Sequence, residues 1–267
     1  MRQRLITSLV GLAVFFAVLY GLPVKGIVMV FALLCAIASF EMCSINKGLS
    51  ASKSFMAISA VMGGLVPIAV VAGGISYVAV LMLVHIAVIS IFAIIKAVEF
   101  TKGRFIQSFV GTFVVTYLLS AVMKIFIFAE NGKLCVLLPF AIAWLTDVFA
   151  QQVGMRFGKK KLCPKISPKK TVAGSVGGLF GGVFGAVAIG LIFPQIGIGV
   201  WDLILMGFFG SIISQIGDLS MSMAKRLNDV KDFGNIFPGH GGVLDRFDSV
   251  MLAAPFVELI LRNLDIM

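Results

Sequence analysis

The sequence predicts an all-α integral membrane protein with about nine transmembrane helices. Of its 267 residues, 60% are hydrophobic and only 13% are charged. The mean hydropathy is +1.08, far above the values of soluble proteins. A chain of this length could not bury so much apolar surface in its own core, so we expect much of it to face lipid.

Nine apolar segments approach or exceed the ~20 residues with which a helix crosses ~30 Å of hydrocarbon. In chain order they are Leu5–Leu22, Gly26–Ile45, Phe55–Ala72, Ile75–Ile95, Phe105–Ala129, Cys135–Phe157, Thr171–Phe193, Trp201–Met223 and Val243–Leu264. The first follows two arginines, as a signal peptide would, but its apolar run is too long for one. We therefore expect an uncleaved first helix.

The basic residues assign an orientation to these spans. The chain carries a net charge of +10, with 22 lysines and arginines. If the N-terminus is cytoplasmic, eighteen of the 22 fall in cytoplasmic segments, as the positive-inside rule predicts. The basic excess is then explained by orientation and by attraction to anionic lipid, so we expect the bilayer as a partner and no nucleic acid.

Two basic segments in the C-terminal half dominate the cytoplasmic side. We therefore divide the chain into N-terminal helices, 1–134, and a C-terminal region, 135–267, which we expect to carry the functional site within one continuous membrane domain. The first basic segment, Arg156–Thr171, contains prolines and many charges, which predict a loop. Its Ser167, Lys169, Lys170 and Thr171 directly precede a helix, whose free N–H groups favour an anion. A phosphate grip and simple retention by anionic lipid both remain open.

The helix after this loop is rich in regularly spaced glycines. They form two ridges at four-residue spacing, Gly174, Gly178 and Gly182 on one and Gly177, Gly181 and Gly185 on the other. Small residues at this spacing let transmembrane helices approach closely. The ridges predict tight helix packing and would permit a homodimer.

Several carboxylates fall inside or beside the apolar segments. Asp147 lies mid-span, Asp218 lies one helical turn before Ser222, and Asp245 and Asp248 share a helix face. An ionised side chain at a helix centre costs roughly 2.5–3.5 kcal/mol, so these acids must meet water, lysines or cations. For Asp147, catalysis and pairing with polar neighbours both remain open.

Clustered carboxylates without cysteine suit a hard cation, above all Mg²⁺, which bridges carboxylates to substrate phosphates. Nearby lysines and arginines would bind the remaining phosphate charge. This chemistry fits phosphoryl or nucleotidyl transfer. Buried acids are equally typical of a cation-coupled transporter, and the residues alone leave both open.

The second basic segment carries a long motif with mixed residue types and fixed spacing. It runs Ser222-x-x-Lys225-Arg226-x4-Lys231-Asp232-x-Gly234-x3-Pro238-x-His240-Gly241-Gly242-x-x-Asp245-Arg246-x-Asp248. This motif resembles the signature of the phosphatidate cytidylyltransferases, or CDP-diacylglycerol synthases. The Asp147 segment, the Ser167–Thr171 loop and Gly217-Asp218 also look like family features, so the resemblance covers roughly the C-terminal half.

The resemblance implies a multi-span enzyme of the inner membrane with its active site on the cytoplasmic side of the C-terminal helices. Such an enzyme transfers CMP from CTP to phosphatidate, giving CDP-diacylglycerol and pyrophosphate, and requires Mg²⁺, with room for a second cation. A related CTP-dependent lipid enzyme, such as a polyprenol kinase or an ether-lipid cytidylyltransferase, is the alternative.

The resemblance also implies roles for individual residues. The metal ligands would be Asp218, Asp245, Asp248 and Asp147. The remaining catalytic residues would be Lys225, Arg226 and His240. The substrate-binding residues would be Ser167, Lys169, Lys170, Thr171, Ser222, Lys231, Asp232, Gly241, Gly242 and Arg246. His240 could act as acid or base, phosphate contact or turn stabiliser.

Three further expectations concern residues around this site. Ala173 stands where the family motif usually has glutamate, which puts the loop's role in metal or substrate binding in doubt. Glu41 and Glu258 lie near span ends, and we expect them to be interfacial. The four cysteines show no paired spacing and are expected to be reduced.

Overall fold

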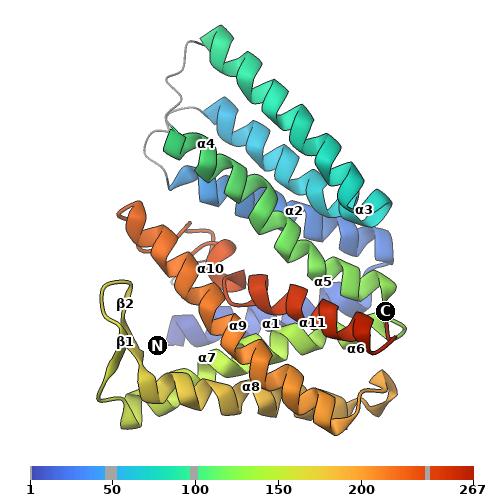
Figure 1. Ribbon diagram of the computed structural model, residues 1–267, viewed down its shortest axis with the longest axis vertical. Coiled ribbons are helices and arrows are strands. Elements are labelled where there is room, and N and C mark those ends of the chain that lie inside the picture. The colour runs from blue at the N-terminus through green and yellow to red at the C-terminus, as the bar shows by residue number, and fades with distance from the viewer. Residues whose placement is uncertain (1, 46–52, 97–101, 238–240) are drawn as a thin grey trace. The chain divides into compact units, whose positions relative to one another are not determined.

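The protein is almost entirely helical, as predicted (Figure 1). The computed structural model describes residues 2–45, 53–96, 102–237 and 241–267. The helices are α1 (Arg2–Gly21), α2 (Val24–Ser44), α3 (Lys53–Lys96), α4 (Lys102–Phe109), the π-helix η1 (Val110–Val115), α5 (Thr116–Phe128), α6 (Gly132–Cys135), α7 (Leu137–Phe157), α8 (Val172–Ile192), the 3-10 helix η2 (Pro194–Ile196), α9 (Val200–Leu227), α10 (Leu244–Phe247) and α11 (Val250–Asn263).

Within the described ranges, six helical stretches are long and apolar enough to cross a membrane, which describes a multi-pass membrane protein. They are Val24–Ser44, Lys53–Phe92, Phe105–Phe128, Gly132–Phe157, Val172–Ile192 and Val200–Leu227. The count of nine is not confirmed. Lys53–Phe92 covers the expected segment Phe55–Ala72 and most of Ile75–Ile95. Helix α1 contributes only a shorter apolar helix, Leu9–Gly21, and α11 has 14 residues.

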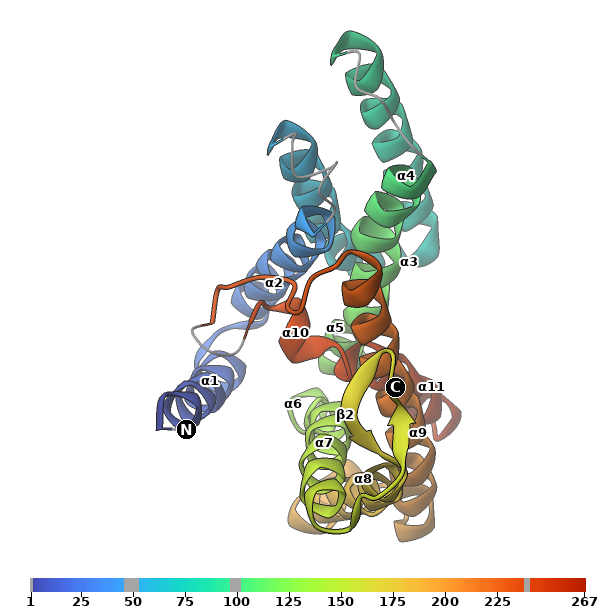
Figure 2. The same ribbon diagram turned by 90° about the vertical axis from the view of Figure 1, so that its left-hand side faces the viewer.

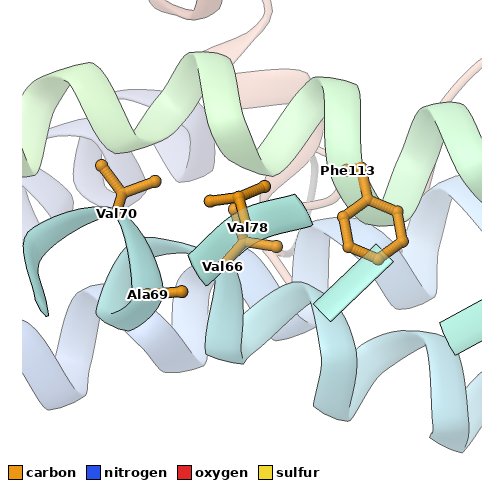
Figure 3. Packing of buried hydrophobic residues seen from close by; sticks show 5 residues of the cluster. All are labelled: Val66, Ala69, Val70, Val78 and Phe113. Carbon is orange, nitrogen blue, oxygen red and sulfur yellow. The ribbon is translucent and has the colours of Figure 1, made fainter. Parts of the chain in front are cut away.

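Helix α3 is two helices joined at a sharp break. Gly74 has φ +63° and ψ −147°, a conformation open almost only to glycine. On either side of the break, Val66 and Val70 pack with Val78 and with Phe113 of η1 (Figure 3). The two apolar segments expected at Phe55–Ala72 and Ile75–Ile95 therefore form one hairpin of helices.

The described residues form two compact units that interleave along the chain. Unit 1 comprises Met1–Met123 and Asn228–Arg246, and unit 2 comprises Lys124–Leu227 and Phe247–Met267. Most of the second basic segment thus belongs with the N-terminal helices, although it is far from them in sequence.

Unit 1 is held together partly by buried hydroxyl groups. Ser39 Oγ donates to the backbone oxygen of Ser59 at 2.9 Å and lies 3.2 Å from Thr112 Oγ1. The hydroxyls of Ser59 and Ser108 are also 3.2 Å apart. These bonds link α2, α3, α4 and η1 and satisfy polar groups that have no water to bond to.

Unit 2 is built on the glycines of α8, and the predicted close packing is confirmed. A Cβ on Gly181 would lie 2.4 Å from Leu145 O of α7, and one on Gly182 would lie 2.8 Å from Gly207 O of α9. Both ridges are therefore covered by helices of the same chain. They give no support to a homodimer.

The segment expected as a loop between α7 and α8 is instead a β-hairpin, so that prediction was wrong (Figure 2). Strand β1 (Lys161–Cys163) pairs antiparallel with β2 (Ser167–Thr171). Pro168 fits in β2 because each strand of a two-stranded ribbon is an edge, where one backbone N–H can be missing.

We expect Gly181→Ala to lower the free energy of unfolding by about 1–3 kcal/mol, because the added methyl group would press on rigid backbone of α7. The control is Gly103→Ala in α4, where nothing lies within 4 Å of an added Cβ. Thermal unfolding in detergent measures both. Equal stability of the two variants would contradict the packing described for α8.

Candidate functional site

The first group of predicted site residues lies in unit 2, where the hairpin meets α9. Lys170 Nζ donates to Asp218 Oδ2 in an ion pair, and Ser222 Oγ donates to Asp218 Oδ1 at 3.3 Å. Lys169 is exposed, whereas the adjacent Lys170 is half-buried against Asp218. Only one of the two adjacent lysines reaches the acid.

The base of the hairpin is fixed by Thr171. Its Oγ1 accepts the Gly174 N–H at 3.1 Å and so caps the start of α8. Glycines let α7 come close here, because a Cβ on Gly158 would lie 2.5 Å from the same hydroxyl. Ala173, where the family motif usually has glutamate, is partly buried in the first turn of α8.

Asp147 and Asp248 meet through Ser249. Ser249 Oγ donates to Asp147 Oδ2 at 3.1 Å, and its backbone N–H donates to Asp248 Oδ1 at 2.8 Å. A Cβ on Gly217, directly before Asp218, would lie 2.8 Å from the backbone oxygen of Asp248. Three of the four predicted metal-binding acids are therefore neighbours in unit 2.

The charges of these acids act on one another. Asp248 lies between α10 and α11, outside the six candidate spans. The negative charges of Asp218 and Asp147 and the positive charge of Lys225 all act on its carboxyl group. The three acids and Lys225 are therefore close enough to interact electrostatically.

The two basic residues at the end of α9 differ in their surroundings. Lys225 is buried, with 8% of its surface exposed, and its charge acts on Asp248. Arg226 is exposed, and its Nε donates to the backbone oxygen of Ile166 in the turn of the hairpin at 3.2 Å. Arg226 thus has a hairpin contact that its predicted phosphate-binding role did not include.

The second group of predicted residues lies in unit 1. Asp245 Oδ2 accepts the N–H groups of Phe233 at 2.8 Å and Gly242 at 3.0 Å. Gly241 has φ +82°, which favours glycine, and its backbone oxygen accepts the Phe237 N–H at 2.9 Å. Gly242, predicted to bind substrate, here donates its N–H to Asp245.

The remaining predicted residues are less enclosed. Lys231, Asp232 and Arg246 are exposed, and Ser167 is partly buried. His240 lies outside the described residues, so its predicted role stays a prediction.

Two glutamates expected to lie at the membrane interface are buried within the protein. Glu41 is 3% exposed, and its oxygens accept the N–H groups of Val243 and Leu244 at 2.9 and 2.8 Å. Glu258 is 6% exposed and pairs with Lys124 at 2.6 Å and Arg262 at 3.0 Å. The signal that could have found Glu41 is its place in an apolar segment, where acids are usually functional.

The oxygen donors of unit 2 fit Mg²⁺ in kind, because hard cations take carboxylate ligands. Within the part of the chain that the structure describes, however, no three His, Cys, Asp or Glu side chains are arranged to hold a metal ion. Asp218 is instead neutralised by Lys170. Magnesium therefore stays a prediction.

Spanning helices and an acid–lysine cluster define the class as a multi-pass membrane protein with a polar, charged site. The chain belongs to the cytidylyltransferase family, whose model matches residues 2–264. It is 36% identical to a phosphatidate cytidylyltransferase of Staphylococcus aureus (strain COL), over 98% of this chain and 99% of the relative. The corresponding protein of Staphylococcus epidermidis (strain ATCC 12228 / FDA PCI 1200) is 34% identical with the same coverage of both chains.

The pairing of Lys170 with Asp218 predicts energetic coupling. In a double-mutant cycle of Lys170→Met and Asp218→Asn, we expect a coupling free energy of about 1 kcal/mol or more, because both side chains are partly buried. Unfolding in detergent measures it. The matched cycle with Lys169→Met should be additive within about 0.5 kcal/mol. Equal coupling for the two lysines would refute the specific pairing of Lys170 with Asp218.

Proposed function

We propose that the protein transfers CMP from CTP to phosphatidate. The main support for this proposal is the match, over 98% of this chain, to relatives named phosphatidate cytidylyltransferase. The family signature from Ser222 to Asp248 supports the proposal. In the reaction, a phosphate oxygen of phosphatidate attacks the α-phosphorus of CTP, and the bond to the β-phosphate oxygen breaks. CDP-diacylglycerol and pyrophosphate are the products.

We propose that Asp147, Asp218 and Asp248 hold the divalent cation, with Asp245 added by the family resemblance. When bound, Mg²⁺ would neutralise triphosphate charge. Lys225 and Lys170 would neutralise further phosphate charge from their places beside these acids. Thr171 and Ser222 would orient Lys170 and Asp218, since Thr171 caps α8 next to Lys170 and Ser222 bonds to Asp218.

We further propose that all nine apolar segments are embedded in the inner membrane, with the N-terminus, the β-hairpin and residues 228–242 on the cytoplasmic side. The distribution of basic residues supports this orientation. In this arrangement α3 supplies two spans, on either side of Gly73-Gly74, and α11 forms the helical part of the ninth.

The orientation predicts how cysteines react in intact cells. With Cys35, Cys43 and Cys135 replaced by serine, Cys163 in the partly exposed β1 strand should react with a membrane-permeant maleimide but not with an impermeant one. A cysteine placed at Gln195, between α8 and α9, should react with both in bacterial cells with a permeabilised outer envelope. The reverse pattern would overturn the proposed orientation.

The activity is tested with CTP labelled at the α-phosphorus, phosphatidate and Mg²⁺. We expect label in a lipid product, and a loss of about a hundredfold or more in kcat for Asp218→Asn, because a group that organises transition-state charge is lost. Lys161→Met, at an exposed lysine of β1 outside the predicted site residues, is the control. Transfer from the γ-phosphate would indicate a kinase, and no lipid product with either label would refute the proposal.

A further inference from the structure

The carboxylate of Glu41 binds the backbone of the signature segment, Ser222–Asp248. Glu41 lies in a helix about 200 residues earlier in the sequence. Glu41 lies near the end of α2, and its two oxygens each accept one N–H, Oε1 from Val243 and Oε2 from Leu244. Both residues belong to unit 1, as does Glu41. Two hydrogen bonds to one charged group fix the orientation of these two consecutive peptide units.

Two glycines of the same segment enclose this carboxylate. An added Cβ would lie 2.3 Å from Glu41 Oε1 on Gly242 and 2.5 Å from the same atom on Gly234. The carboxylate therefore touches the segment at two points that are eight residues apart in sequence. Any other side chain at either glycine would push the carboxylate away.

Glu41 and Asp245 together hold four backbone N–H groups of the segment. Asp245 accepts those of Phe233 and Gly242, and Glu41 accepts those of Val243 and Leu244. In the described residues no ion pair joins Glu41 to a lysine or arginine. Backbone N–H groups thus stabilise the buried Glu41 carboxylate, as a basic side chain usually does for a buried acid.

We propose that Glu41 is a positioning residue for the signature segment, setting the place of Asp245 and of the Gly241-Gly242 turn. Asp245 directly follows Leu244, whose N–H Glu41 binds, so its Cα lies one peptide, about 3.8 Å, from a fixed residue. The inference rests on the proposed function for its kinetic consequence. The geometry on which it stands is independent of that function.

Glu41→Gln tests the proposal because the amide keeps the size of the side chain but replaces one acceptor oxygen with a donor. One backbone N–H then faces another donor. We expect the amide hydrogens of Val243 and Leu244 to exchange at least about tenfold faster in the full-length protein in lipid nanodiscs. We also expect kcat for CDP-diacylglycerol formation to fall at least about tenfold, measured well below the unfolding temperature.

Glu258→Gln is the matched control. Glu258 is an equally buried glutamate, but it pairs with Lys124 and Arg262 in unit 2. Its variant should lower thermal stability without speeding amide exchange at residues 243 and 244. A stabilising role alone would give both variants the same kcat in their folded fraction.

Gly234→Ala provides a second route if Glu41→Gln does not accumulate as folded protein. Its methyl group should displace the Glu41 carboxylate and reproduce the faster exchange and the lower kcat. Unchanged exchange at both amides, or kcat within about twofold of the Glu258→Gln value, would overturn the inference. A third outcome separates the two proposals. If the wild-type protein forms no CDP-diacylglycerol but amide exchange at residues 243 and 244 is faster only in Glu41→Gln, the proposed function is refuted and the positioning contact is supported.

Discussion

The close approach of α8 to its neighbours is the constraint on which the unit 2 site depends. Where α8 begins, Gly154 of α7, Gly158 directly after α7 and Gly174 of α8 leave room for the Thr171 hydroxyl group. That hydroxyl group caps α8, and Thr171 itself is the last residue of strand β2. The preceding residue, Lys170, pairs with Asp218. Small residues in the membrane thus determine where a charged side chain lies outside the helices.

The helices could be predicted because hydropathy reports burial in lipid, whatever the tertiary contacts are. The break at Gly73-Gly74 falls in the two-residue gap between predicted segments. The hairpin could not be predicted, because its prolines and lysines argue against a strand and only the pairing of Lys161 with Thr171 and Cys163 with Ser167 reveals it. Local propensity gave the wrong answer where a tertiary contact decides the structure.

The motif acids were foreseen as a set, but their individual partners were not. Lys170, Asp218 and Ser222 were all candidates, and the structure joins them. Glu41 was missed because its partners are backbone N–H groups 202 and 203 residues away, which leave no trace in side-chain patterns. A sequence shows which acids are unusual for their surroundings, whereas only coordinates show which peptide units they bind.

The lysines of the hairpin are of two kinds, exposed and half-buried. Lys169 and Lys161 stand in solvent, where dissolved ions screen a charge within about 8 Å at physiological ionic strength. Lys170 is half-buried against its carboxylate and is shielded from those ions. Added salt should therefore weaken whatever the outer lysines attract, such as anionic headgroups, while leaving the inner pair intact. Ionic strength thus distinguishes the exposed lysines of the β-hairpin from Lys170, which pairs with Asp218.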